Sequence, residues 1–231
     1  MLQHVYERAC QARYLTRVIV ATDDDRVFEE ARRFGAQVRM TRADHPSGTD
    51  RAAEVASAEN ADLVVNIQGD EPLIDPAAID AAVVALSDAP EIPMGTLMKR
   101  IEDPAETADP NVVKVVTDRD GNAIYFSRAP IPALRDGGAG VRFKHIGLYV
   151  YRRDFLLEYP RLPIGPLERA ERLEQLRAIE NGYRIRVAET EYESLGVDTP
   201  ADLERVARLF EVAAGPQTSL VNQGRWPNTS S

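Results

Sequence analysis

Residues 62–75 read DLVVNIQGDEPLID, and this stretch decides the fold. Its first six residues, 62–67, are mostly apolar and rich in β-branched side chains, which predicts a buried strand. The strand runs into Gly69-Asp70-Glu71-Pro72. Pro72 prevents the strand ladder from continuing, whereas packing gives no reason for two adjacent carboxylates. We therefore expect a buried strand whose carboxyl end carries chemistry that packing does not explain.

Strands and helices alternate on both sides of this stretch. We expect strands over residues 17–22, 37–41, 62–67, 143–151 and 187–190, and helices over residues 2–12, 25–34, 47–59, 76–86, 167–181 and 200–210. Residues 112–117 and 123–126, joined by a turn at Asp120-Gly121-Asn122, predict an antiparallel hairpin. Because alternation at this spacing is typical of βαβ units, we predict an α/β fold with a mostly parallel central sheet and helices on both faces.

The composition excludes several classes of protein. With 44% hydrophobic and 28% charged residues, the 231-residue chain is typical of a globular protein. A net charge of −9 argues against a nucleic-acid binder, and one cysteine cannot form an intramolecular disulfide. No apolar stretch is long enough for a membrane span and no leader opens the chain, so we expect a cytoplasmic protein. We expect one domain over residues 1–212 and a disordered tail over residues 213–231, which are polar and aperiodic.

Two acidic positions suit a hard cation. Ligands of an open parallel sheet bind beyond the carboxyl ends of the strands, where Asp70 lies. Asp198 precedes a helix that Thr199 and Asp202 can cap, so the helix does not require Asp198. Mg²⁺ takes one or two carboxylates together with substrate phosphates. Taken alone, each position is equally consistent with a solvated acid in a loop.

Two further stretches carry polar side chains that could face a ligand. Residues 47–51 place two hydroxyls, a glycine and an arginine at a helix start, where anions bind, although Ser47 is also a good N-cap. Alternation along residues 144–152 places four residues on one strand face: His145, Gly147, Tyr149 and Tyr151. A lone histidine is more often a core residue, but this combined face suits a sugar with many hydroxyls.

Six stretches, in this order, resemble the 3-deoxy-manno-octulosonate cytidylyltransferase family, also called CMP-Kdo synthetases. They are HPSGTDR (45–51), NIQGDEPLI (66–74), YFSRAPIP (125–132), KHIGLYVYR (144–152), LERAERLEQLRAIENG (167–182) and ESLGVDTPADLE (193–204). The similarity runs from about residue 1 to residue 210. It implies the α/β fold of nucleotide-diphospho-sugar transferases, Mg²⁺ dependence and a homodimer. It also implies the reaction of CTP with 3-deoxy-manno-octulosonate (Kdo) to CMP-Kdo and pyrophosphate, a step of lipopolysaccharide synthesis.

The resemblance also implies roles for individual residues. Two carboxylates match the catalytic metal ligands: Asp70 and Asp198. Three residues match the nucleotide side: Ser47, Arg51 and Gln68. Five residues match the sugar side: Arg128, His145, Tyr149, Glu174 and Gln175. Because Kdo carries a carboxylate, we expect Arg128 to bind it.

The sequence departs from the family pattern at its start. Members begin with a strand and a loop of the type PARxxSxRxPGKxL, ahead of the helix that residues 1–9 match. Without that strand we expect the strands at 17–22 and 62–67 to face a gap or to keep unpaired backbone groups, and the chain to be inactive and poorly soluble. Three alternatives stay open: a cytidylyltransferase whose start is incomplete, a catalytically silent nucleotide- or sugar-binding relative, and a CMP-sialic acid synthetase.

Overall fold

The structure is a computed structural model that describes residues 1–135, 140–197 and 199–214, the last three by their backbone only. The chain divides into two compact units, Met1–Gly196 and Val197–Ser231. The predicted tail at 213–231 and the predicted metal ligand Asp198 lie outside the described residues, apart from the backbone of 213 and 214.

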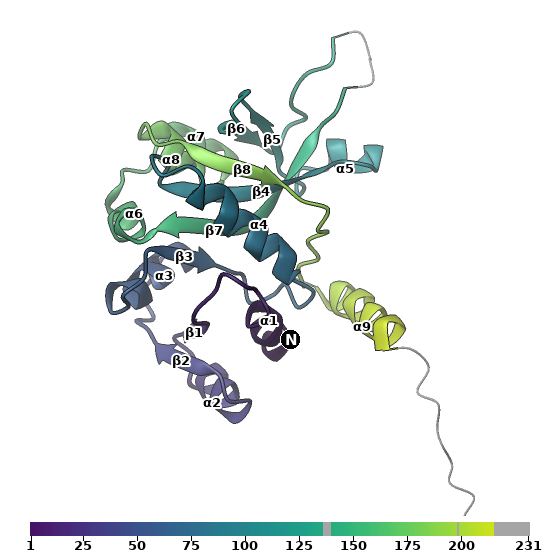
Figure 1. Cartoon of the computed structure of the whole chain (residues 1–231). Coiled ribbons are helices and arrows are strands. Elements are labelled where there is room, and N and C mark those ends of the chain that lie inside the picture. The colour runs from purple at the N-terminus through teal and green to yellow at the C-terminus, as the bar shows by residue number, and fades with distance from the viewer. Residues whose placement is uncertain (136–139, 198, 215–231) are drawn as a thin grey trace, which may run out of the picture. The chain divides into compact units, whose positions relative to one another are not determined.

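The first unit contains a six-stranded sheet in the order β6-β5-β7-β4-β8, with β3 paired to β7 (Figure 1). Its strands are β3 (Leu63–Asn66), β4 (Met94–Arg100), β5 (Lys114–Thr117), β6 (Ala123–Ser127), β7 (Phe143–Arg152) and β8 (Ile185–Glu189). The α/β prediction and the hairpin, β5–β6, are confirmed. Four of its six strands run in the same direction, but the pairings are mostly antiparallel, because β7 lies antiparallel between β3 and β4; among the described residues, β4 and β8 are the one parallel pair of this sheet. The sequence did not predict this reversed strand.

Helices cover both faces of this sheet. On one face, α4 (Pro76–Ser87) packs on β7, whose side chains there include Ile146 and Leu148, and α1 (Leu2–Ala9) contacts α4 in the same core cluster. On the other face lie α3 (Gly48–Ser57), α6 (Arg153–Glu158), η1 (Tyr159–Arg161), α7 (Pro166–Glu171) and α8 (Leu176–Glu180). There Tyr151 joins the second core cluster. The alternation along β7 therefore assigns its residues to two separate cores.

Local sequence signals fix the ends of several helices. The side chains of Asp24, Ser47 and Asp75 accept backbone N–H groups at the starts of α2 (Asp25–Arg33), α3 and α4. Asp103 does the same for α5 (Pro104–Ala108). Gly35 follows α2 with a φ of 80°, the left-handed conformation that glycine adopts without strain.

The predicted helix at 167–181 is wrong in one respect: it is two short helices, α7 and α8. Arg172 separates them with a φ of 52°, which a non-glycine residue rarely adopts. The side-chain carboxylate of the preceding residue, Glu171, accepts hydrogen bonds from the hydroxyl of Ser127 (2.7 Å) and the backbone N–H of Arg128 (2.9 Å). These contacts with the end of β6 hold the chain in the turn, and helix propensity alone could not reveal them.

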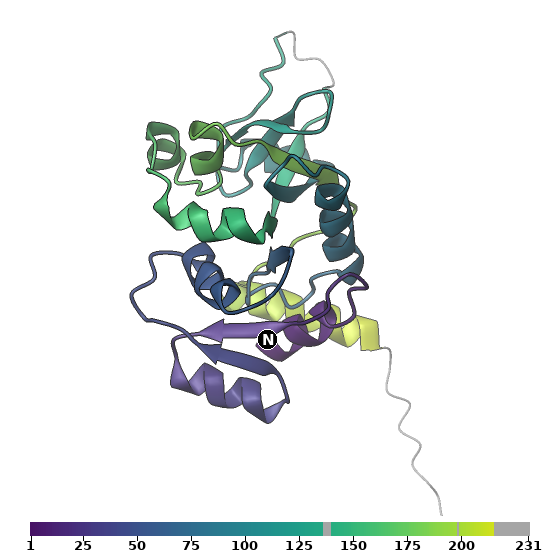
Figure 2. The same cartoon turned by 60° about the vertical axis from the view of Figure 1, so that its left-hand side comes forward.

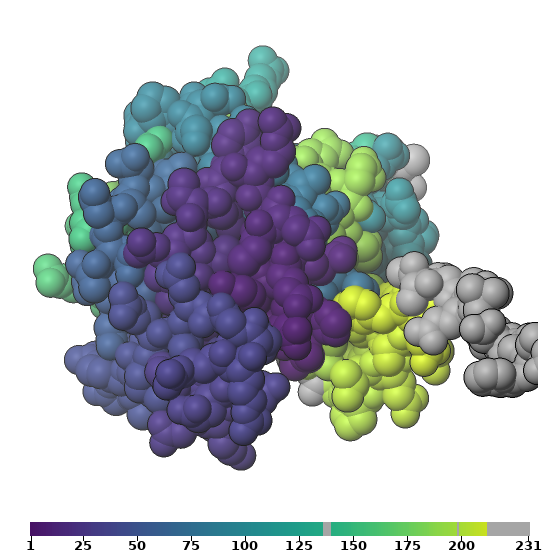
Figure 3. Space-filling model, turned by 60° about the horizontal axis from the view of Figure 1, so that its bottom comes forward, coloured from purple at the N-terminus to yellow at the C-terminus, as the bar shows by residue number. Residues whose placement is uncertain are grey.

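The strands β1 (Ile19–Thr22) and β2 (Gln37–Met40) form a separate, parallel two-stranded sheet (Figures 1 and 2). β1 pairs only with β2, and β3 pairs only with β7, within the part of the chain that the structure describes. A cavity of about 970 Å³ lies against both strands, lined by residues 19–21 and 63–66 among others. The expected gap between these strands is therefore confirmed. Figure 3 shows α1 and the segment after it, in purple, spread over the surface beside β1, α2 and β2.

The second unit is described as one helix, α9 (Pro200–Ala214). The backbone N–H of Thr199 donates to the carboxylate of Asp202 (2.9 Å), and the N–H of Asp202 donates to the hydroxyl of Thr199 (3.2 Å). This reciprocal pair confirms the predicted capping box. Across the described residues of both units, none of the helices has the length and apolarity that crossing a membrane requires.

Candidate active site

The loop after β3 holds two carboxylates in different environments. Asp70 has a buried Oδ1 with no hydrogen-bond partner among the described residues. Glu71 is only 7% exposed, and its carboxylate accepts hydrogen bonds from the hydroxyls of Tyr192 (3.0 Å) and Ser194 (2.8 Å). Burial raises the pKa of Glu71, while these two donors oppose the rise and the charge of Asp70 adds to it. The loop thus presents one carboxylate with all its oxygens in use and one with a free oxygen.

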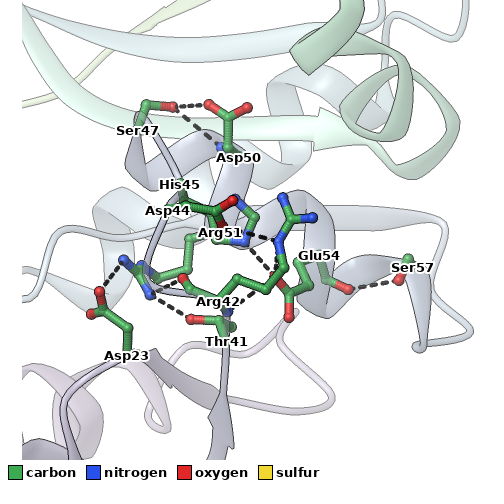
Figure 4. A network of polar contacts seen from close by, with 10 residues as sticks. All are labelled: Asp23, Thr41, Arg42, Asp44, His45, Ser47, Asp50, Arg51, Glu54 and Ser57. Atoms are coloured by element: carbon green, nitrogen blue, oxygen red, sulfur yellow. Dashed lines mark hydrogen bonds and ion pairs between the residues drawn. The ribbon is translucent and has the colours of Figure 1, made fainter.

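Arg51 belongs to a polar network at the start of α3, shown in Figure 4. Its guanidinium pairs with Asp23 (3.2 Å) and donates to the hydroxyl of Thr41. Arg51 and Gln68 both line the 970 Å³ cavity beside β1 and β3. Two of the three residues predicted for the nucleotide side therefore face the same cavity.

Ser47 links the predicted nucleotide side to the predicted sugar side. Its Oγ accepts the N–H of Asp50 (3.2 Å), as an N-cap does, and lies 2.5 Å from an Asp50 carboxylate oxygen. The same Oγ lies 3.3 Å from Oε1 of Glu174, which comes from the turn between α7 and α8. Both interpretations of Ser47, a cap and a site residue, are compatible with this geometry.

His145 lies on β7 as an uncharged ring. Burial lowers its pKa to about 3. Its Nε2 lies 2.9 Å from Oγ1 of Thr96, which also lies 2.8 Å from the carbonyl of Leu148. A hydroxyl has one proton, so if Thr96 donates to that carbonyl, Nε2 of His145 donates to Thr96 and Nδ1 remains an acceptor. Thr96 could not be recognised from the sequence, because its pairing with β7 is a long-range contact.

An aromatic row continues from His145 along the same strand face. The rings of His145 and Tyr149 have centroids 5.4 Å apart, and those of Tyr149 and Tyr151 are 6.0 Å apart. Burial is the main cause that raises the pKa of each tyrosine, and the nearby charge of Glu174 adds to it. A Cβ at Gly147 would meet nothing within 4 Å, so the face is open between the first two rings. The predicted wall of one histidine and two tyrosines is confirmed as a structure.

Glu174 and Gln175 sit at one edge of this wall. Burial raises the pKa of Glu174, opposed by hydrogen bonds and by the charge of Arg177. Gln175 is 3% exposed, and its Nε2 has no hydrogen-bond partner among the described residues. A buried amide donor of this kind needs an acceptor, which a bound ligand or a water can provide.

A buried ion pair lies behind Glu174 and Gln175, and the sequence analysis did not predict it. Arg177 donates to both carboxylate oxygens of Glu168, at 2.9 and 2.6 Å, and its guanidinium lies 5.2 Å from the ring centroid of Tyr159. The hydroxyl of Tyr159 donates to the backbone carbonyl of Glu174 (2.7 Å). The pair could have been found only by knowing that the two helices fold back on each other.

Arg128 holds together the end of the hairpin and the end of α7. Its guanidinium donates to the backbone carbonyls of Glu171 (2.8 Å) and Pro110 (2.9 Å). Arg128 therefore has a clear structural role, and a ligand carboxylate would have to share or replace these carbonyl acceptors. Its predicted role toward the sugar remains a prediction.

No group of three or more histidine, cysteine or acidic side chains close enough for a metal ion occurs among the described residues. Asp70 supplies one buried carboxylate oxygen without a partner, which is the kind of ligand that Mg²⁺ prefers.

The comparisons with known proteins identify the family. The cytidylyltransferase family model matches residues 1–185. The 3-deoxy-manno-octulosonate cytidylyltransferase of Solibacter usitatus (strain Ellin6076) is 74% identical over 214 residues, which are 92% of this chain and 85% of the relative. The chain belongs to this cytidylyltransferase family.

A second sequence relative and two solved structures are also similar to the chain. The 3-deoxy-manno-octulosonate cytidylyltransferase of Geobacter sulfurreducens is 56% identical over 217 residues, which are 89% of this chain and 87% of the relative. A structure of CMP:2-keto-3-deoxy-manno-octonic acid synthetase complexed with CTP is 46% identical and has a TM-score of 0.87, covering 90% of this chain and 86% of that one. A 4-diphosphocytidyl-2C-methyl-D-erythritol synthase from Anaerococcus prevotii, 13% identical with a TM-score of 0.59, shares the fold alone.

Proposed function

We propose that this cytidylyltransferase chain transfers CMP from CTP to the anomeric 2-hydroxyl of Kdo, giving CMP-Kdo and pyrophosphate for lipopolysaccharide synthesis. The observation that carries the proposal is the 74% identity over 92% of the chain to a 3-deoxy-manno-octulosonate cytidylyltransferase. The close structural relative complexed with CTP agrees with the nucleotide substrate. A silent relative and a CMP-sialic acid synthetase are not favoured by these similarities.

The reaction is an in-line displacement at the α-phosphorus of CTP. The Kdo hydroxyl oxygen forms a bond to phosphorus, the bond to the bridging oxygen of the β-phosphate breaks, and pyrophosphate leaves with the electron pair. The hydroxyl proton passes to solvent or to a carboxylate of the site. The protein contributes mainly by positioning the two substrates and by offsetting charge.

We propose that Asp70, together with Asp198, binds Mg²⁺. The unpartnered, buried Oδ1 of Asp70 supports this, because a carboxylate oxygen left without a donor needs a cation or a proton. When bound, Mg²⁺ would neutralise charge on the α-phosphate and lower the pKa of the attacking hydroxyl. Asp70 lies just after β3, at the carboxyl end where ligands of α/β sheets bind.

The remaining residues divide between the two substrates. We assign Ser47, Arg51 and Gln68 to the nucleotide, supported by the position of Ser47 and Arg51 at the start of α3, where anions bind. We assign the sugar to five residues: Arg128, His145, Tyr149, Glu174 and Gln175. The unpartnered amide of Gln175 and the open face at Gly147 support a polyhydroxylated ligand there. His145 would accept or donate a hydrogen bond as a neutral ring, and it is not a general base near pH 7.

We also propose a cytoplasmic homodimer. The substrate CTP and the absence of a membrane-spanning helix among the described residues are consistent with that compartment. Large apolar side chains exposed on and beside the hairpin, Ile124 (57% exposed) and Val141 (48%), are suitable for a contact between two copies.

Pyrophosphate release with CTP, Kdo and Mg²⁺ tests the activity. Two forms should be assayed: the 231-residue chain, and an extended form that carries a strand and the basic loop of the family pattern ahead of Met1. Mass spectrometry should find CMP-Kdo, and replacing Kdo by sialic acid should abolish the signal. Turnover with sialic acid, or CTP binding without turnover in either form, would contradict the proposal.

A further inference from the structure

The loop that carries Asp70 is fastened from two sides. Nε of Arg8, on α1, donates to the carbonyl of Ile74 (2.7 Å). On the other side, the carboxylate of Glu71 accepts hydrogen bonds from Tyr192 and Ser194, more than 120 residues later in the chain. Glu71 thus joins the loop that bears Asp70 to residues 192–194.

We propose that Glu71 is a positioning residue for the cation: it fastens the Asp70 loop to Tyr192 and Ser194 and so fixes the place of the Asp70 carboxylate. The inference rests on the Mg²⁺-dependent function proposed above. Both carboxylate oxygens of Glu71 are occupied by hydroxyl donors, so Glu71 orients a ligand without being one. Asp70, next to it, keeps a free buried oxygen.

Burial makes a role in packing alone a poor explanation for Glu71. A carboxylate that is 7% exposed loses hydration, and two neutral hydroxyls replace it only in part. An apolar side chain of similar size would fill the same space without that cost. What the carboxylate adds is a pair of directed hydrogen bonds between distant segments, and such bonds fix ligand geometry in the way that outer-shell partners of metal sites do.

Glu71→Gln keeps the size of the side chain but replaces one acceptor oxygen by an NH₂ group. The chain offers a matched control: the hydroxyl of Tyr183 donates to the carboxylate of Glu158 (3.1 Å), the same type of contact on the surface of the first unit. We would compare Glu71→Gln with Glu158→Gln, and Tyr192→Phe with Tyr183→Phe. Ser194→Ala adds a second mild variant on the Glu71 side.

Two measurements report on the cation. Binding of Mn²⁺ alone, from the amplitude of the free-ion EPR signal, needs no turnover. The Mg²⁺ concentration at half-maximal pyrophosphate release is measured in whichever of the two forms turns over faster. We expect Glu71→Gln to lower the Mn²⁺ affinity about tenfold and to raise the half-maximal Mg²⁺ concentration about tenfold, since outer-shell changes cost 10–100-fold in metal affinity. Tyr192→Phe and Ser194→Ala should each change both quantities by roughly threefold in the same directions. The control variants should match the wild type, and thermal unfolding shows which variants fold.

Unchanged Mn²⁺ affinity and Mg²⁺ requirement in Glu71→Gln would overturn the inference, as would equal losses in the Glu158 and Tyr183 controls. If Glu71→Gln does not fold, unchanged metal affinity in both Tyr192→Phe and Ser194→Ala overturns it instead. Failure of the wild type itself to bind Mn²⁺ would overturn the metal assignment of Asp70, and this inference with it. That result is distinct from the others, because they all require a wild type that binds the ion.

Discussion

The gap between β1 and β3 makes a prediction about folding stability. Both strands offer a free edge of four residues, Ile19–Thr22 and Leu63–Asn66, to the same 970 Å³ cavity. A strand rises about 3.3 Å per residue, with about 4.8 Å between strands and 10 Å between layers, so one strand residue occupies roughly 160 Å³. The cavity therefore has room for about six extended residues. We predict that an apolar strand of this length, joined by a loop ahead of Met1, inserts between β1 and β3 and stabilises the chain.

The size of the effect follows from three contributions. The two free edges offer roughly eight backbone hydrogen bonds worth about 1 kcal/mol each, which offsets the cost of about 1–2 kcal/mol for ordering each of about six residues. Burial of apolar side chains at about 1.5–3 kcal/mol each then determines the net gain. Even if only two or three side chains are fully buried, the free energy of unfolding rises by several kcal/mol. For a chain of this size each kcal/mol is worth about 2–4 °C, so the Tm should rise by on the order of 10 °C.

Differential scanning calorimetry measures this rise, and the soluble yield is a second readout. The matched control is an extension of equal length built from glycine and serine, which can enter the cavity but buries no apolar surface. A second control places proline at the centre of the apolar strand, where it removes a ladder donor. Equal Tm values for the apolar and the glycine–serine extensions would refute the insertion.

Three further predictions concern the site. Asp70→Asn should reduce Mg²⁺-dependent pyrophosphate release by about a hundredfold or more, since a metal-ligand charge is worth several kcal/mol, while circular dichroism stays unchanged; near-normal turnover would remove Asp70 from the metal site. Arg128→Ala should raise the KM for Kdo far more than the KM for CTP. Equal increases in the two KM values would mean that Arg128 has only a structural role, through its contacts with Glu171 and Pro110. Because burial lowers the pKa of His145 to about 3, the unfolded chain takes up a proton there below about pH 6.5 and the folded chain does not. As the pH falls from 6 to 4, this residue should therefore reduce the free energy of unfolding by up to about 1.4 kcal/mol per pH unit. Urea titrations should show a shallower pH dependence of that free energy in His145→Gln.

Local sequence signals predicted those parts of the fold that depend on neighbours in the chain. Ser47, Asp75 and the Thr199–Asp202 pair cap helices as their positions indicate. The alternation along residues 143–152 predicted which side chains share a face. Both follow from backbone groups and periodicities that operate within a few residues.

Features that depend on distant partners could not be predicted in this way. The reversed direction of β7 depends on pairing with β3, some 80 residues earlier, and nothing within residues 143–152 encodes it. The break at Arg172 lies within a run of good helix formers, and contacts of Glu171 with the end of β6 override their propensity. Thr96 and the Glu168–Arg177 pair were missed for the same reason.

The two adjacent carboxylates after β3 have different tasks because their side chains meet different surroundings. In an extended or turning backbone, successive side chains point in different directions, so Asp70 and Glu71 cannot share one site equally. Glu71 turns toward Tyr192 and Ser194 and is saturated by them, whereas one oxygen of Asp70 stays buried without a partner. Glu71, with a hydroxyl donor on each oxygen, fastens the loop, while the partnerless oxygen of Asp70 suits a cation. β3 ends at Asn66 and the chain turns at Gly69-Asp70, so both carboxylates lie beyond the carboxyl end of the strand, where the substrates are proposed to meet.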